Sequence, residues 1–137
     1  EVRFDLNTDG DIDGADEDLE IPRAPEWSYN VGFNYDLTLG GWGYATLRAS
    51  YAYRDDMAWS EDNNAFILDQ KIVDAGLDFY SNDGSWVFSL YGRNLLNEVK
   101  HGGDSQLPVQ LGPVPLGGTF SPLAKGRVYG AEVTWNF

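Results

Sequence analysis

The last eleven residues, 127–137, alternate between apolar and polar side chains, and this pattern limits the possible fold more than any other feature. They read RVYGAEVTWNF. One face of the predicted strand carries only apolar or aromatic residues, which are Tyr129, Ala131, Val133, Trp135 and Phe137. A period of two is typical of a strand whose two faces meet different surroundings. The exposed aromatic end, and a length that suits a tilted membrane strand, predict the closing end of an outer-membrane β-barrel.

The same alternation predicts four earlier strands, over residues 26–37, 43–54, 71–81 and 86–94. We therefore expect an all-β fold, an antiparallel up-and-down meander of about five strands that forms the C-terminal segment of a transmembrane β-barrel. The connections alternate in length, with short ones at 38–42 and 82–85 and long ones at 55–70 and 95–126. Tight periplasmic turns and long outer loops alternate in this way in membrane barrels.

Aromatic residues gather at both ends of the predicted strands, as the two membrane interfaces of a barrel require. At the short-turn end they are Tyr35, Trp42, Phe79, Trp86, Trp135 and Phe137, and at the other end Trp27, Tyr53 and Tyr129. A soluble β-sandwich also has alternating strands. Its strand ends would not carry so many Trp and Tyr residues, so the pattern favours the barrel.

Composition excludes several other classes of protein. The sequence has no run of about eighteen apolar residues, so it predicts no transmembrane helix. A mean hydropathy of −0.39 is compatible with a barrel, because half of each strand faces a polar lumen. The net charge of −13 argues against nucleic acid as a partner, and the absence of cysteine excludes disulfides and thiolate metal sites. The chain begins at Glu1 without a signal segment, so we expect a processed protein or a piece of a longer one.

Segment 86–98, WVFSLYGRNLLNE, resembles the strand followed by G-[KR]-N-L-x-[DN]-[EK] near the end of TonB-dependent outer-membrane receptors. Residues 120–137 resemble the last strand of the same family, and the resemblance covers residues 25–137. It implies a twenty-two-stranded barrel, an N-terminal plug domain and a periplasmic segment that touches TonB. Because 137 residues have room for about five strands, we expect the C-terminal piece of such a receptor.

The resemblance also implies a function and a set of partners. The function is TonB-dependent uptake of a scarce ligand, such as a siderophore, cobalamin or a carbohydrate, across the outer membrane of a Gram-negative bacterium. The partners are outer-membrane lipid, the remainder of the barrel and plug domain, and TonB through the N-terminal part. In this family the barrel-assembly machinery recognises the aromatic last strand, here Tyr129, Trp135 and Phe137. Five charged residues of the predicted lumen face would form ion pairs with the plug or contact substrate: Arg48, Asp74, Asp78, Arg93 and Glu132.

Residues 5–16, DLNTDGDIDGAD, fit the calcium-loop pattern D-x-[DN]-x-[DN]-G at its first six positions. Calcium takes six to eight oxygen ligands, which alternate residues of a tight loop can supply. The candidate ligands are Asp5, Asn7, Asp9, Asp11 through its carbonyl, Asp13 through water, and Asp16. Asp16 replaces the bidentate Glu of EF-hand sensors, so the loop resembles dockerin loops more closely. The alternative is a solvated acidic loop without a metal.

Counting hairpins back from a periplasmic Phe137 places the acidic residues 1–24 outside the cell as a first domain, before the barrel strands of residues 25–137. Calcium outside the cell is often millimolar, which suits a weak structural site. The single histidine, His101, has only Asp104 and Ser105 near it in sequence, which is not the geometry of a catalytic triad. We predict no enzyme. The alternative function is a calcium-dependent binding or adhesion module with a soluble β fold, which would need no detergent.

Overall fold

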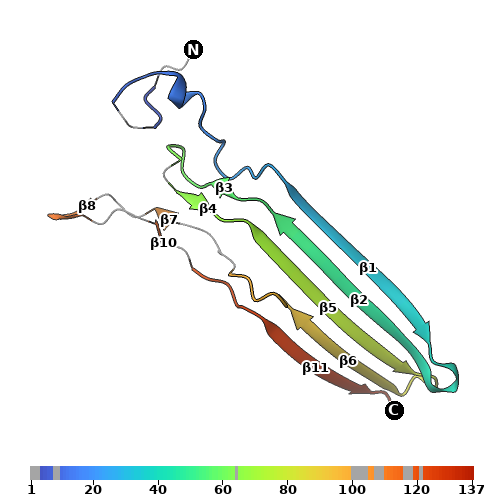
Figure 1. Cartoon of the computed structure of the whole chain (residues 1–137). Coiled ribbons are helices and arrows are strands. Elements are labelled where there is room, and N and C mark those ends of the chain that lie inside the picture. The colour runs from blue at the N-terminus through green and yellow to red at the C-terminus, as the bar shows by residue number, and fades with distance from the viewer. Residues whose placement is uncertain are drawn as a thin grey trace. The chain divides into compact units, whose positions relative to one another are not determined.

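The computed structural model describes residues 4–7, 10–63, 65–99, 105–106, 110–115, 119–120 and 122–137. Five long strands form one sheet, in the order β1-β2-β5-β6-β11 (Figure 1). Their bounds are β1 (Ser28–Thr38), β2 (Gly43–Arg54), β5 (Gln70–Ser81), β6 (Trp86–Arg93) and β11 (Val128–Trp135). Each long strand pairs with the next long strand along the chain, and Figure 1 shows their directions alternating. The predicted all-β antiparallel meander is therefore confirmed.

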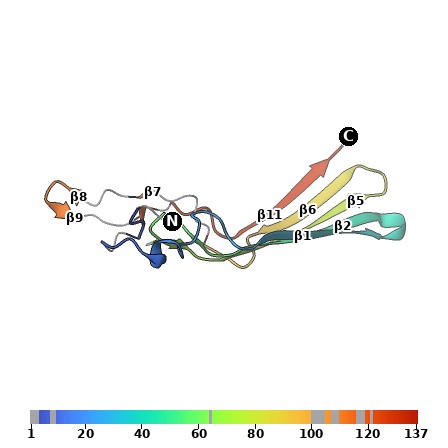
Figure 2. The same cartoon turned by 90° about the horizontal axis from the view of Figure 1, so that it is seen from above.

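The register of the last three strands separates an apolar face from a polar face. Leu90 of β6 lies opposite Leu77 of β5 and Ala131 of β11. One residue along, Ser89 lies opposite Asp78 and Glu132. Because successive side chains of a strand point to opposite sides, the leucines share one face and the charged residues share the other. The sheet is not flat, and Figure 2 shows its strands fanning apart along their length.

The apolar face exposes large aromatic side chains rather than packing them into a core. Tyr29, Phe33 and Trp135 are 47%, 56% and 60% exposed. At the short-turn end the rings contact one another across strands, with centroids 6.0 Å apart for Phe79 and Phe88 and 5.8 Å apart for Trp86 and Trp135. An apolar surface of this kind marks a site of interaction with another apolar phase or partner.

The two short connections are tight and hydrogen-bonded. A three-residue 3₁₀ helix, η2 (Gly40–Trp42), joins β1 to β2. Gly43 follows with φ of 138°, and a Cβ atom there would overlap the carbonyl oxygen of Tyr80 on β5. Only glycine allows both this backbone conformation and this close approach. At the second turn, the backbone N–H of Asn136 donates to the carbonyl of Ser85 at 2.8 Å, which ties the end of the chain to the turn.

The long connections contain short antiparallel pairs that the sequence did not predict. They are β3 (Met57–Ala58) with β4 (Phe66–Ile67), β7 (Ser105–Gln106) with β10 (Thr119–Phe120), and β8 (Gln110–Leu111) with β9 (Val114–Pro115). Two residues are too few to show an alternation, so no sequence pattern could reveal them. Met57, Ala58 and Ile67 are buried in this part of the chain.

The chain divides into two compact units. One holds the five-stranded sheet, over Tyr29–Tyr53, Gln70–Val99 and Lys125–Phe137. The other comprises Glu1–Ser28, Arg54–Asp69 and Lys100–Ala124, and it includes a short 3₁₀ helix, η1 (Gly14–Asp16). Among the residues that the structure describes, no helix is long and apolar enough to cross a membrane.

Candidate functional site

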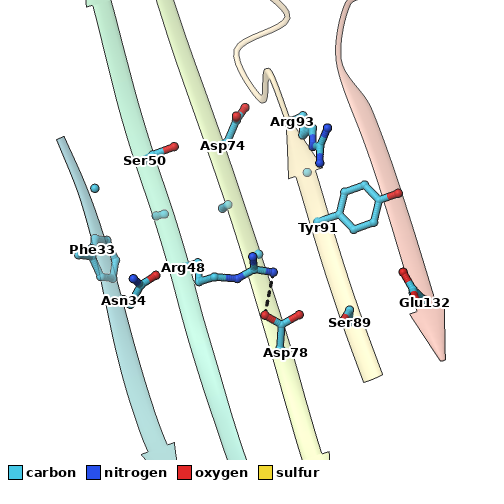
Figure 3. Close-up of a pocket in the computed structure, with 15 residues that line it drawn as sticks. Phe33, Asn34, Arg48, Ser50, Asp74, Asp78, Ser89, Tyr91, Arg93 and Glu132 are labelled. Atoms are coloured by element: carbon cyan, nitrogen blue, oxygen red, sulfur yellow. Dashed lines mark ion pairs between the residues drawn. The ribbon is translucent and has the colours of Figure 1, made fainter. Parts of the chain in front are cut away.

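A trough of about 530 Å³ lies on the polar face of the five-stranded sheet (Figure 3). Residues from all five strands line it. The sequence assigned five charged residues to this face, and all of them line the trough: Arg48, Asp74, Asp78, Arg93 and Glu132. The alternation of the strands was therefore sufficient to identify the charged lining.

Small residues make the floor of the trough and leave room for long side chains to lie along it. A Cβ atom at Gly76 would come within 3.2 Å of Nη2 of Arg48, so the guanidinium lies close against the backbone of β5. On the other side, the ring of Tyr91 covers Gly130, where a Cβ atom would overlap the ring. Ser50 and Ser89 add hydroxyl groups to the lining. The result is a shallow polar surface with cationic, anionic and hydroxyl groups within a single hollow.

Arg48 and Asp78 form an ion pair across neighbouring strands. Nη2 of Arg48 lies 2.7 Å from Oδ2 of Asp78, and Figure 3 shows this contact as a dashed line. The side chain of Arg48 is 52% exposed, whereas that of Asp78 is only 10% exposed. The sequence predicted ion pairs between this face and a plug, but this pair forms within the sheet. The strand that carries Arg48 has no acidic residue, and the sequence gives no sign of a cross-strand partner because that partner depends on register.

The other three charged residues are arranged differently. Oδ1 of Asp74 accepts a hydrogen bond from the backbone N–H of Asn94 at 2.7 Å. The guanidinium of Arg93 lies 5.7 Å from the centre of the Tyr91 ring. Among the described residues, neither Arg93 nor Glu132 has an oppositely charged group within ion-pairing distance. Each of these two side chains therefore presents a charge to the trough that no ion pair within the described residues neutralises.

An aromatic pair on this polar face was not predicted. The rings of Tyr44 and Tyr80 are stacked, with centroids 4.6 Å apart and planes inclined by 12°. Both residues occupy polar-face positions in the alternation of β2 and β5, so the sequence predicted the face on which each lies. Their contact could not be inferred, since it requires the register of two strands joined by a long connection.

The acidic N-terminal segment is organised by Asp16, which is only 3% exposed. Its Oδ1 accepts from the N–H groups of Leu6 and Asn7 at 2.7 and 3.1 Å, and its Oδ2 accepts from the N–H of Asp13 at 3.0 Å. The hydrogen bonds from Asn7 and Asp13 are the main cause of a lowered pKa for Asp16. This carboxylate therefore closes the segment by binding its own backbone.

The remaining candidate calcium ligands are only partly brought together. Oδ2 of Asp5 accepts from the N–H of Gly10 at 3.0 Å, and Oδ1 of Asp13 accepts from the N–H of Ala15 at 2.8 Å. Asp9 lies outside the described residues. Within the described part of the chain, no three acidic or histidine side chains are grouped so as to hold a metal ion. Calcium binding by this segment stays a prediction.

The residues considered for catalysis cannot be compared with the structure. His101 and Asp104 lie outside the described residues, and of Ser105 only the backbone, in β7, is described. The predicted assembly signal is described in full. Tyr129 and Trp135 lie on the apolar face of β11, and the Phe137 ring is 5.8 Å from that of Trp135.

An open antiparallel sheet with one exposed aromatic face and one polar face is the wall of a β-barrel. The chain matches the family model described as TonB dependent receptor-like, beta-barrel, over residues 3–95. This match covers more than half of the sequence, and the chain belongs to that family. TonB-dependent receptors are a transporter family of outer-membrane barrels, which confirms the resemblance read from the sequence.

The extent of the match differs from the resemblance seen in the motifs. It begins within the acidic N-terminal segment and ends at Leu95, so it includes β1 to β6 and not β11. Neither a curated protein nor a solved structure matches the chain.

Proposed function

We propose that this chain forms part of the wall of an outer-membrane receptor that takes up a scarce ligand by TonB-dependent transport. The observation that carries the proposal is the contrast between the two faces of one sheet. The apolar face suits contact with lipid, and the charged trough on the other face suits a polar lumen. Membership of a receptor family supports the same function. Siderophores, cobalamin and carbohydrates are the proposed classes of ligand, and catalysis is not part of the proposal.

Within this proposal, the trough faces the plug domain of the complete receptor. Arg93 and Glu132 would then find opposite charges on the plug, because unpaired charges are costly once a surface is covered. TonB would act through the plug-bearing part of the receptor, and the barrel-assembly machinery would act on the last strand.

The test uses the full-length receptor that contains this segment, expressed in a Gram-negative host with and without TonB. We expect the receptor in the outer-membrane fraction, extracted by detergent and not by alkaline carbonate. Recovery as a detergent-independent periplasmic or secreted protein would overturn the proposal in favour of a soluble adhesion module. Uptake of labelled cyanocobalamin, ferrichrome or maltodextrin that requires TonB would then identify the class of ligand.

We further propose that residues 5–16 bind a structural calcium ion. Two hydrogen bonds support this, because Asp16 and Asp5 bring the two ends and the middle of the segment together. Oδ1 of Asp5 is buried and has no hydrogen-bond partner among the described residues, which leaves it available to a cation. The acidic side chains of residues 5–16 would repel one another if they converged further, and a cation would remove that repulsion.

Calcium binding is tested by limited proteolysis of the full-length receptor in chelator and in calcium. We expect millimolar calcium to protect residues 1–24, with an affinity of about 10⁻⁴–10⁻³ M, and magnesium to protect them poorly. Asp9→Ala should weaken protection more than Asp13→Ala, whose contact is through water. Equal cleavage with and without calcium would leave an acidic surface segment only.

A further inference from the structure

The segment that follows β6 folds around one buried asparagine. Asn94 is 2% exposed and has φ of 52°, a left-handed conformation that asparagine adopts more readily than most residues. Its side-chain amide donates to the carbonyl of Glu98 at 2.8 Å, and its Oδ1 accepts from the N–H of Glu98 at 2.9 Å. The backbone N–H of Asn94 donates to Asp74 on β5. Both the nitrogen and the oxygen of this side-chain amide therefore form a hydrogen bond to the backbone of Glu98.

A second asparagine reaches across to the strand that returns from the long connection. Asn97 also has a positive φ, 58°, and its Oδ1 accepts from the backbone N–H of Arg127 at 3.1 Å. The guanidinium of Arg127 donates back to the carbonyl of Leu95 at 3.2 Å. The N–H of Leu95 donates in turn to Val73 of β5 at 2.8 Å. Residues 95 and 97 are thus bonded to residue 127 although about thirty residues separate them along the chain.

The strand pair β6–β11 needs such a device more than the pairs that are closed by short turns. Strands β1 and β2, and strands β5 and β6, are each joined by a turn of four residues that fixes their register. Strands β6 and β11 are joined by a connection of more than thirty residues, which cannot define a register by its own geometry. A slip by one residue would move Tyr129 and Trp135 to the polar face.

We propose that Asn94, Asn97 and Arg127 form a clasp that fixes the register of β11 on β6 in place of a tight turn. The clasp holds the two ends of the long connection together, at residues 94–98 and at Arg127, and attaches them to Asp74 of β5. The segment between these two ends, residues 99–126, can then change in length without moving the strands. This role concerns the assembly of the wall and is independent of the ligand transported.

Directly opposed residues provide a readout of register. Ser89 and Glu132 are paired in the sheet, whereas Ser89 and Thr134 would be paired only after a slip of two residues. The chain has no cysteine, so introduced pairs report without interference. The experiment places Ser89→Cys with Glu132→Cys, or with Thr134→Cys, in the full-length receptor and measures disulfide yield in outer membranes. It also measures amide hydrogen exchange in β6 and β11.

Asn97 is the informative position because its side chain is exposed, so its replacement leaves no buried cavity. In Asn97→Ala we expect at least fivefold faster exchange of β11 amides than in the wild type, and a higher yield for the slipped pair. Asn97→Asp, which keeps the acceptor oxygen, should restore both values. Asn63→Ala, at another positive-φ asparagine in the other unit, is the matched control and should leave β11 unchanged.

Two results would overturn the clasp. One is wild-type exchange and cross-linking in Asn97→Ala. The other is an equal loss of protection in β5–β6 and β6–β11, which would indicate general destabilisation. If Asn97→Ala fails to assemble, Arg127→Lys removes the guanidinium contact while keeping the charge, and the same two measurements apply. The readouts do not involve uptake, so a failure here is separable from a failure of the proposed transport function.

Discussion

Leu77 and Asp78 are adjacent in sequence and meet opposite surroundings in the sheet. Leu77 is 39% exposed on the apolar face, opposite Leu90, while Asp78 lies in the trough and pairs with Arg48. The alternation in the sequence predicted this division residue by residue, because it requires only that the segment be a strand. It could not predict the partner of Arg48 or the contact between Tyr44 and Tyr80, since those depend on how two strands are aligned.

The first prediction tests this division. In the full-length receptor, Leu77→Arg should destabilise the barrel by about 2–4 kcal/mol, because a guanidinium would be placed in lipid near mid-membrane. Folded yield in bilayers and the denaturant midpoint measure the effect. Ser89→Arg is the matched control, since Ser89 lies in the trough between Asp78 and Glu132 and should cost much less. Equal yields for the wild type and Leu77→Arg would mean that the faces are assigned the wrong way round.

At the scale of the element, the turn between β5 and β6 is held by the carboxylate of Asp83. It accepts hydrogen bonds from the hydroxyl groups of Ser81 and Ser85, at 2.6 and 2.7 Å, and from the N–H of Ser85 at 3.1 Å. These bonds favour the ionised form and lower the pKa of Asp83 from 3.8 to about 2, with the Ser81 hydroxyl as the largest cause.

The second prediction follows from the sign of this shift. The folded pKa is below the unfolded value, so the contribution of Asp83 to stability is present above pH 4 and is lost as the pH falls toward 2. Amide exchange in residues 82–85 should accelerate over that window in the wild type. Asp83→Asn should show faster exchange already at neutral pH and a flatter response to acid. An identical acid profile in the two proteins would contradict a role for the carboxylate.

Element boundaries were predictable to within two residues where an alternating strand meets a Gly- or Asn-rich turn, as β2 and β5 show. The two-residue strands within the long connections were not predictable, because they are too short to carry a period. The clasp was visible in sequence only as a family motif, G-R-N-L-L-N-E. Its physical basis, two left-handed asparagines at the root of a connection, became apparent only from the backbone angles and the hydrogen bonds.

At the scale of the whole molecule, the sheet ends in β1 and β11, and each of these strands has one edge that pairs with no other described strand. An antiparallel sheet with an exposed aromatic face and two open edges is complete only when further strands close it into a barrel. The aromatic rings of Trp86, Trp135 and Phe137 lie together at the short-turn end of the last hairpin. These rings would be accessible to another protein before further strands close the sheet into a barrel.

The third prediction concerns these rings. Deletion of Phe137 from the full-length receptor should lower its level in the outer membrane, because the terminal aromatic residue would be read by the assembly machinery. Immunoblots of outer-membrane fractions measure the level, and Phe137→Tyr, which keeps an aromatic ring, is the control. Unchanged levels after the deletion would show that Phe137 serves only in packing against Trp135.

The close approach of Gly43 to Tyr80 has a consequence for how this family can diverge. Two strand backbones meet at that point without space for a methyl group, so neither a substitution at Gly43 nor an insertion beside it leaves the strands in place. The long connections carry no such restriction. Among relatives, length changes should therefore accumulate between β2 and β5 and between β6 and β11. The turn before Gly43 should keep one length in all of them, so the short-turn end of the sheet should be constant while the long connections vary.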